Sequence, residues 1–332
     1  MQLDYHVLMY RKVYKVPGIK PYLLKDVNGI YFPMKNLLTR DKYSGVSERY
    51  RSQALLDFEK YQYNTVYRDL FLKAKSHFQF SIPKVTLELG CGAGNLTLPF
   101  LQNSNQKILA TDISREQLEI LSIVIENLNL SNRVNLIQID NSKFFFKEYS
   151  FELIIGAAIA HHLIDPITLF ELAIKGLKVN GSLLLFEPIL SGSLIVREAI
   201  IEIVSKLENS LPHDVLIFLN DIAIDIRERS DEFSTKSLDQ RKQLDDKSFV
   251  DIDLIRKNFS NISIEVMPIL DHSLGSTVSQ HIKNILSMYL GWSEFSKLPQ
   301  DFWQILNNFD IHFDTSQESP VIEGAIHVKR LS

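Results

Sequence analysis

The stretch VTLELGCGAGNLT at residues 85–97 decides the fold of this chain. Its first five residues are apolar or β-branched around one glutamate, which is typical of a buried strand. Gly90, Gly92 and Gly94 then form a turn, and a helix-like pattern follows. Glycine suits such a turn because it adopts positive φ and lets another molecule approach the backbone closely. A strand, a glycine turn and a helix in succession present backbone N–H groups to a ligand at the edge of an α/β sheet.

The spacing of the glycines narrows the kind of ligand. The pattern Glu-x-Gly-x-Gly-x-Gly differs from the Gly-x-Gly-x-x-Gly of dinucleotide-binding proteins, and no Lys-Ser or Lys-Thr pair follows it as in a P-loop. A nicotinamide-dependent dehydrogenase is therefore not favoured, and we expect no NADH binding. Cys91 lies between two of the glycines. We interpret it as a small filler, because no base partner for a nucleophilic thiol is near it in the sequence.

Strand-like and helix-like patterns alternate from residue 84 onward, which is typical of a doubly wound, mostly parallel sheet. The first five expected strands are 85–89, 107–111, 134–139, 151–155 and 182–186. Ser114 and Gln117 fit a capping box at the start of one connecting helix. Asp165 before Pro166 marks the start of another, which we expect to run to about Leu177, before the stop signal at Asn180-Gly181. Right-handed crossovers place the carboxyl ends of the strands, where ligands bind, at one edge.

The composition changes at about residue 80. Residues 1–80 carry 14 Lys and Arg against 7 Asp and Glu and hold ten of the twelve tyrosines, whereas the chain as a whole has a net charge of −4. We therefore expect a basic, Tyr-rich N-terminal extension or lid at 1–80. A solvated face that docks on the acidic remainder is the favoured interpretation. An anionic substrate, an acidic carrier protein or nucleic acid are the alternatives.

Residues 81–332 are expected to form one α/β domain with two helical insertions, at about 189–248 and 273–317. Within the first insertion, the polar stretch 227–247 is expected to be exposed. Hydrophobic residues make up 45% of the chain, so a packed core is expected, and a single cysteine excludes a disulfide framework or a thiolate zinc cluster. No apolar run has the length of a membrane span and no signal peptide is visible, so we expect a cytoplasmic protein.

Two parts of the sequence carry a resemblance to a known family. The glycine turn resembles the first motif of class I S-adenosylmethionine (SAM)-dependent methyltransferases, and NGSLLLFEP at 180–188 resembles their strand-five motif. The resemblance implies a seven-stranded Rossmann-like sheet whose last strand is antiparallel, and 262–267 and 321–328 are suited to the two further strands. The insertion at 189–248 resembles the helical substrate lid of small-molecule methyltransferases.

The resemblance also implies a cofactor site. Gly90, Gly92 and Gly94 would lie under the methionine part of SAM, and Glu88 would help to hold its ammonium group. Asp112, at the end of the second strand, would accept both ribose hydroxyls, and Asp140, at the end of the third, would face the adenine amino group. The remaining residues expected at the cofactor are Ile113, Asn141, Gly156 and Ala157.

Methyl transfer from a sulfonium is an in-line displacement in which the protein mainly aligns the acceptor and excludes water. An acceptor that must lose a proton also needs a base, and His161 and His162 after the fourth strand are the candidates. The alternative is that they hold the loop by hydrogen bonds. Glu187 is a second candidate, for which a structural hydrogen bond is favoured. No His, Asp or Glu set with ligand spacing is visible, so no metal site is expected.

These observations favour a methyltransferase acting on an O, N or C atom of a small hydrophobic or amphipathic molecule, in secondary metabolism. An RNA or protein methyltransferase and a non-catalytic SAM-binding regulatory or scaffold protein are the alternatives. Nucleic acid is disfavoured because the catalytic part is acidic. The small-molecule substrate is the main expected partner. No membrane contact is expected, and a homodimer through the N-terminal extension stays open.

Overall fold

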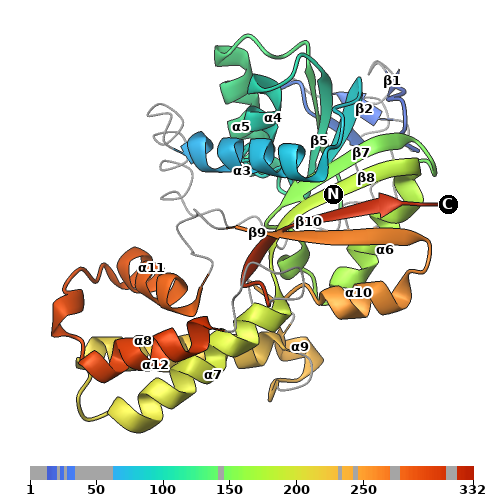
Figure 1. The fold of residues 1–332 in the computed structure, drawn as a ribbon. Coiled ribbons are helices and arrows are strands. Elements are labelled where there is room, and N and C mark those ends of the chain that lie inside the picture. The colour runs from blue at the N-terminus through green and yellow to red at the C-terminus, as the bar shows by residue number, and fades with distance from the viewer. Residues whose placement is uncertain are drawn as a thin grey trace.

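The computed structural model describes residues 13–20, 23–25, 28–33, 63–140, 146–230, 234–241, 246–269, 277–311 and 320–332. In this part of the chain a mixed β-sheet carries helices on both faces, and a separate group of helices projects from one end (Figure 1). The strands lie in the order β1-β2-β3-β6-β5-β4-β7-β8-β10-β9. The predicted α/β class, with an open and mostly parallel sheet, is confirmed.

Seven of these strands form the part of the sheet that the sequence predicts. They are β4 (Val85–Leu89), β5 (Lys107–Asp112), β6 (Val134–Gln138), β7 (Phe151–Ala157), β8 (Leu177–Pro188), β9 (Ile262–Pro268) and β10 (Glu323–Arg330). β4 to β8 pair in parallel, and β10 pairs antiparallel with both β8 and β9. β4 has β5 on one side and β7 on the other, so the strand order reverses at the glycine turn. Ligands bind at such a switch point.

The sheet has ten described strands rather than the seven expected. The three additional ones are β1 (Val13–Tyr14), β2 (Leu23–Lys25) and β3 (Tyr31–Pro33). β3 pairs in parallel with β6 through Tyr31 and Ile137, and Leu23, Leu24 and Ile30 are buried. This part of the N-terminal extension therefore continues the sheet. Residues 34–62 lie outside the described residues, so the division of the chain at residue 80 stays a prediction.

One strand begins earlier than predicted: β8 starts at Leu177 and not at residue 182. The helix that begins after Asp165 ends at Gly176, within one residue of the predicted end, and Asn180 lies inside β8 with φ +63°. Gly176 packs against Phe146, since a Cβ at this position would lie 2.4 Å from the Phe146 ring. Asn180 and Gly181 therefore belong to an irregular start of the strand, where the pairing with β7 shifts register.

Two helix starts follow the predicted capping patterns. Ser114 accepts a hydrogen bond from the Gln117 N–H at 3.4 Å, and Asp165 accepts one from the Ile167 N–H at 3.0 Å. The helices on one face of the sheet are α3 (Tyr63–Phe78), α4 (Thr97–Gln102) and α5 (Arg115–Asn127), and those on the other are α6 (Pro166–Gly176) and α10 (Ile252–Asn258) (Figure 1). They bury both faces of the strands, as a doubly wound sheet requires.

The two helical insertions pack together as one unit, which we call the lid. It consists of α7 (Leu190–Leu207), α8 (His213–Arg229), α11 (Val278–Leu290) and α12 (Gln300–Asp310), grouped away from the sheet in Figure 1. The lid has its own apolar core, which includes Ile200, Leu219, Leu286 and Phe302. α7 begins directly after β8, so the lid lies at the carboxyl ends of the strands. None of the described helices is long and apolar enough to span a membrane.

Candidate active site

The glycine turn after β4 packs against protein side chains at two of its glycines and is open at the third. Gly90, Gly92 and Gly94 have φ of +63°, +50° and +106°, a region that L side chains rarely adopt. A Cβ at Gly90 would lie 2.6 Å from Ile159, and one at Gly94 would lie 2.5 Å from Leu121. At Gly92 a Cβ would meet no protein atom within 4 Å. The turn is therefore packed beneath Gly90 and Gly94 and accessible to a ligand at Gly92.

Asp112 lies beside this accessible side of the turn. Its Oδ2 accepts a hydrogen bond from the Gly92 N–H and its Oδ1 accepts one from the Ser114 N–H, both at 2.8 Å. The two backbone donors fix the orientation of the carboxylate. This geometry fits the predicted contact with a ribose.

Glu88 is buried under the turn, with an exposed fraction of 1%. Burial raises its pKa to about 8. The charge of Asp112 adds to this rise, and a hydrogen bond from the Thr97 hydroxyl at 2.5 Å opposes it. The carboxyl is therefore mostly neutral at pH 7, and an ammonium group bound nearby would favour its charged form.

The other predicted cofactor residues lie at the same edge of the sheet where they are described. The Ile139 N–H donates to the Asp112 carbonyl at 2.8 Å, which places half-buried Asp140 next to the end of β5. Ile113 follows Asp112 directly, and its carbonyl accepts a hydrogen bond from the Gln138 side chain. Asn141 lies outside the described residues.

The two small residues at the end of β7 have different surroundings. Gly156 is required by packing, because a Cβ there would lie 2.9 Å from Leu185 and 3.1 Å from the Leu89 carbonyl oxygen. Ala157 is half-buried at the last position of the strand. The smallness of Gly156 is therefore explained by the sheet itself, without a ligand.

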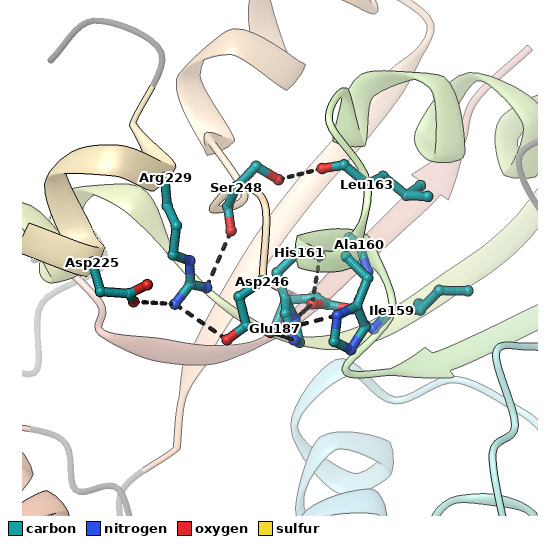
Figure 2. A network of polar contacts seen from close by, with 10 residues as sticks. Ile159, Ala160, His161, Leu163, Glu187, Asp225, Arg229, Asp246 and Ser248 are labelled. Atoms are coloured by element: carbon teal, nitrogen blue, oxygen red, sulfur yellow. Dashed lines mark hydrogen bonds and ion pairs between the residues drawn. The ribbon is translucent and has the colours of Figure 1, made fainter. Parts of the chain in front are cut away.

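His161 is held in place by Glu187. The two histidines lie in a short 3₁₀-helix (Ala160–His162), and the buried Glu187 carboxylate accepts the Ile159 and Ala160 N–H groups at 2.8 Å. Its other oxygen lies 2.8 Å from Nδ1 of His161 (Figure 2). Glu187 therefore orients both the loop and the imidazole, and Nε2 of His161 remains directed away from it.

Burial alone would lower the pKa of His161 and raise that of Glu187, but the contact between them reverses both effects. The hydrogen bond and charge of Glu187 raise the pKa of His161, and Asp246 adds to the rise. The hydrogen bond and charge of His161, with the N–H groups of Ala160 and Ile159, lower the pKa of Glu187. The pair is thus a buried carboxylate with an imidazole that holds its proton more tightly than usual.

A chain of charged residues from the lid reaches the histidines. Arg229 Nη1 lies 3.2 Å from Asp225 Oδ2 and 3.4 Å from Asp246 Oδ2. Asp246 Oδ1 lies 3.5 Å from both His161 Nε2 and His162 Nδ1. Figure 2 shows this chain of contacts running from α8 to the loop after β7.

One expectation is wrong in this region. The stretch 227–247 is not uniformly exposed: Glu228, Arg229, Arg241 and Lys247 are buried. Ser234 and Thr235 donate to the Glu228 carboxylate, and Arg241 donates to the carbonyl groups of Arg229 and Lys247. Sequence spacing did not indicate that ligand atoms of His161, His162 and Asp246 lie within 4.8 Å of one another. Asp246 is far from the histidines in sequence, and no spacing rule could have indicated it.

A cavity of about 550 Å³ lies between the lid and the carboxyl ends of the strands. Its walls include the apolar residues Leu70, Val196, Phe218, Ile222, Phe249 and Ile285. Its polar lining includes His161, Glu187, Asp225, Arg229, Asp246 and Glu323. Burial raises the pKa of Glu323 to about 7. Asp225, Arg229, Asp246 and Glu323 were not predicted from the sequence, because no motif surrounds them.

Comparison with known proteins agrees with this geometry. Residues 86–181 match a family described as a methyltransferase domain. No curated protein sequence matches the chain. The part of the chain around the glycine turn is therefore a methyltransferase domain, with the strand order and cofactor edge described above. Such a domain uses SAM as its methyl donor.

Several solved structures are similar in fold at low sequence identity. The YcgJ protein of Bacillus subtilis is 15% identical with a TM-score of 0.42, covering 79% of this chain and 98% of its own. Phosphoethanolamine N-methyltransferase 2 of Haemonchus contortus, solved with SAM, is 13% identical with a TM-score of 0.47, covering 90% and 60%. Geranyl diphosphate C-methyltransferase of Streptomyces coelicolor A3(2) is 9% identical with a TM-score of 0.45, covering 96% and 92%.

Proposed function

We infer that the protein methylates a small hydrophobic or amphipathic molecule bound in the lid cavity. The observation that carries this proposal is the cavity of about 550 Å³, which has apolar walls and contains His161 in its polar lining. Cavities of this size, mostly apolar with a few placed polar groups, are typical of small-molecule sites. The cavity adjoins the edge of the sheet that carries the glycine turn, so an acceptor in it would lie near the cofactor.

His161 is the proposed base for an oxygen or nitrogen acceptor. SAM supplies an activated methyl group, so the residues of this chain have to position the acceptor, exclude water and take up its proton. Glu187 binds Nδ1 of His161, which leaves Nε2 as the proton-accepting atom. A carbon acceptor activated by its own substituents stays an alternative and would use the same imidazole.

His162 has a secondary place in this proposal. It is about one-third exposed, and its ring lies 4.2 Å from that of His161, between the centroids. His161 lines the cavity and has its Nδ1 bound by Glu187. We therefore assign the base role to His161 rather than to His162.

The decisive experiment uses SAM labelled in its methyl group. The full-length protein is incubated with labelled SAM and a small-molecule extract, and in parallel with total RNA and with cell protein. Label in a low-molecular-weight product supports the proposal. Label only in RNA or protein would favour a macromolecular substrate, and SAM binding without any product would favour a regulatory or scaffold protein.

The N-terminal extension is proposed to contact an anionic part of the substrate or an acidic carrier protein. This rests on the excess of basic residues in 1–80. A homodimer through the same segment and a cytoplasmic location stay predictions. Size-exclusion chromatography with light scattering would test the dimer directly.

A further inference from the structure

We propose that His161, His162 and Asp246 form a binding site for a divalent transition-metal ion at the inner end of the lid cavity. One ligand atom of each residue lies within 4.8 Å of the others. Asp246 Oδ1 is 3.5 Å from His161 Nε2 and 3.5 Å from His162 Nδ1. Only small side-chain rotations are needed to bring such atoms to the bond lengths of about 2 Å that Zn²⁺ takes with imidazole and carboxylate.

Two of the three ligands are oriented by charged groups on their far side. Nδ1 of His161 is bound at 2.8 Å by Glu187, so Nε2 is directed toward the other ligands. A carboxylate on the second nitrogen is the usual outer partner of a metal-binding histidine. Arg229 binds Oδ2 of Asp246 and leaves Oδ1 beside both imidazoles. This outer layer is an observation independent of the ligand cluster itself.

The ligand types indicate the kind of ion. Two imidazole nitrogens and one carboxylate oxygen suit Zn²⁺, Fe²⁺, Co²⁺ or Ni²⁺, whereas Mg²⁺ and Ca²⁺ prefer oxygen ligands. Three protein ligands also leave a coordination position open, and His161 and Asp246 both line the cavity. A bound ion would therefore be accessible from the cavity rather than enclosed as in a structural site.

This inference goes beyond the proposed function and predicts how the two interact. Nε2 of His161 cannot accept a proton while it binds a metal ion. Metal loading and the role of His161 as a base therefore exclude each other, and Zn²⁺ should slow methyl transfer to an acceptor that must lose a proton. The predicted slowing of methyl transfer by Zn²⁺ rests on the proposed function. The metal site itself does not, because ion binding is measured without any substrate.

The test uses the full chain, first treated with a chelator to remove bound metal. The protein is then titrated with Co²⁺, whose visible absorption reports its coordination. We expect uptake of one equivalent, displacement by Zn²⁺, and no competition from Mg²⁺. His162→Ala and Asp246→Ala should each weaken Co²⁺ binding by at least about tenfold. His281→Ala is the matched control, since His281 lines the same cavity outside the cluster, and this variant should bind Co²⁺ as the wild type does.

Circular dichroism and SAM affinity, measured for every variant, separate loss of the site from loss of the fold. No Co²⁺ uptake by the wild type, or equal uptake by folded His162→Ala and Asp246→Ala variants, would overturn the proposal. Faster methyl transfer on metal loading would contradict the base role of His161 and leave the metal site intact. Failure to find a small-molecule product would likewise not alter the titration, so the two proposals fail independently.

Discussion

At the scale of single residues, the three glycines of the turn have separate reasons to be glycine. All three have positive φ, but only Gly90 and Gly94 lie against side chains that a Cβ would strike. Gly92 is open on the side where its N–H meets Asp112. Packing therefore explains the glycines at the first two positions, and at Gly92 we propose that glycine allows close approach by the cofactor.

Alanine substitutions should separate these two roles. At Gly92 an alanine costs about 1–2 kcal/mol of backbone strain, and it should weaken SAM binding about tenfold because its methyl group enters the ligand side. Gly94→Ala should lose about 1–3 kcal/mol more of unfolding free energy, because its Cβ would overlap Leu121. Thermal unfolding and SAM titration check both. Equal loss of stability in the two variants would contradict this assignment.

Glu88 should change its protonation when SAM binds. With its pKa raised to about 8 by burial, it is protonated at about pH 6.5, where the amino group of SAM is already charged. An adjacent ammonium group favours the carboxylate, so binding should release up to about one proton. Calorimetry in buffers of different ionisation enthalpy measures this release, and Glu88→Gln should abolish it. Buffer-independent heats for the wild type would show that Glu88 does not meet the ammonium.

His161 should give the methyl-transfer rate a pH dependence of known sign. Its pKa is raised by Glu187, and a base must be neutral, so kcat/KM should increase as pH rises through a value above the ordinary 6.5 of histidine. Glu187→Gln removes the charge that raises this pKa and should move the ascending limb to lower pH. If the ascending limb of the kcat/KM profile stays at the same pH in a folded Glu187→Gln variant, a group other than His161 causes the pH dependence.

At the scale of elements, the segment after α8 is fastened to the loop that carries the histidines. The Lys247 N–H donates to the His161 carbonyl at 2.8 Å, and the Ser248 hydroxyl donates to the Leu163 carbonyl at 2.8 Å. Arg229 at the end of α8 donates to the Ser248 carbonyl and stacks on Phe249, with its guanidinium 3.9 Å from the ring centroid. These contacts couple the position of the lid to that of the proposed base.

Arg229→Met should loosen this connection while keeping much of the apolar volume. We expect a loss of about 1–3 kcal/mol, since hydrogen bonds of a charged group are removed, and a KM for the acceptor raised about tenfold. SAM affinity should stay unchanged, because the glycine turn is not touched. Unfolding curves, SAM titration and acceptor kinetics measure the three effects. An unchanged KM would mean that the connection does not shape the acceptor site.

At the scale of the whole molecule, the cofactor edge and the cavity belong to different parts of the chain. The cofactor edge is built by β4, β5 and β6. The cavity also needs the lid, which has its own apolar core. The acceptor and the cofactor therefore meet only where the two parts pack together. This arrangement allows the lid to determine the substrate without changing the cofactor site.

A bulkier residue in the lid should consequently weaken binding of the acceptor and leave binding of SAM unchanged. Ile222 on α8 lines the cavity and is half-buried, so Ile222→Trp should fill part of the space and raise the KM of the acceptor about tenfold or more. SAM binding should stay within about twofold of the wild type. A parallel loss of SAM affinity would indicate that the cavity holds the cofactor instead. Ile217→Trp, at an exposed position of the same helix, is the control.

By itself the sequence determined the class of the fold and the strands β4 to β10, because these depend on local signals. The glycine turn, the strand periodicity and the caps at Ser114 and Asp165 each act over a few residues, and each was found where it was predicted. The start of β8 at Leu177 was missed, because pairing with Phe151 of β7 and not the local pattern defines it.

Only the tertiary structure decided what surrounds His161. Glu187, Asp246, Arg229 and Glu323 come from four distant segments, and their roles depend on burial and distance rather than on neighbours in the chain. The raised pKa of His161 and the lowered pKa of Glu187 likewise require the two groups to be buried in contact with each other. Local patterns can encode a strand or a turn, but the lid cavity exists only because the two insertions fold back over the edge of the sheet.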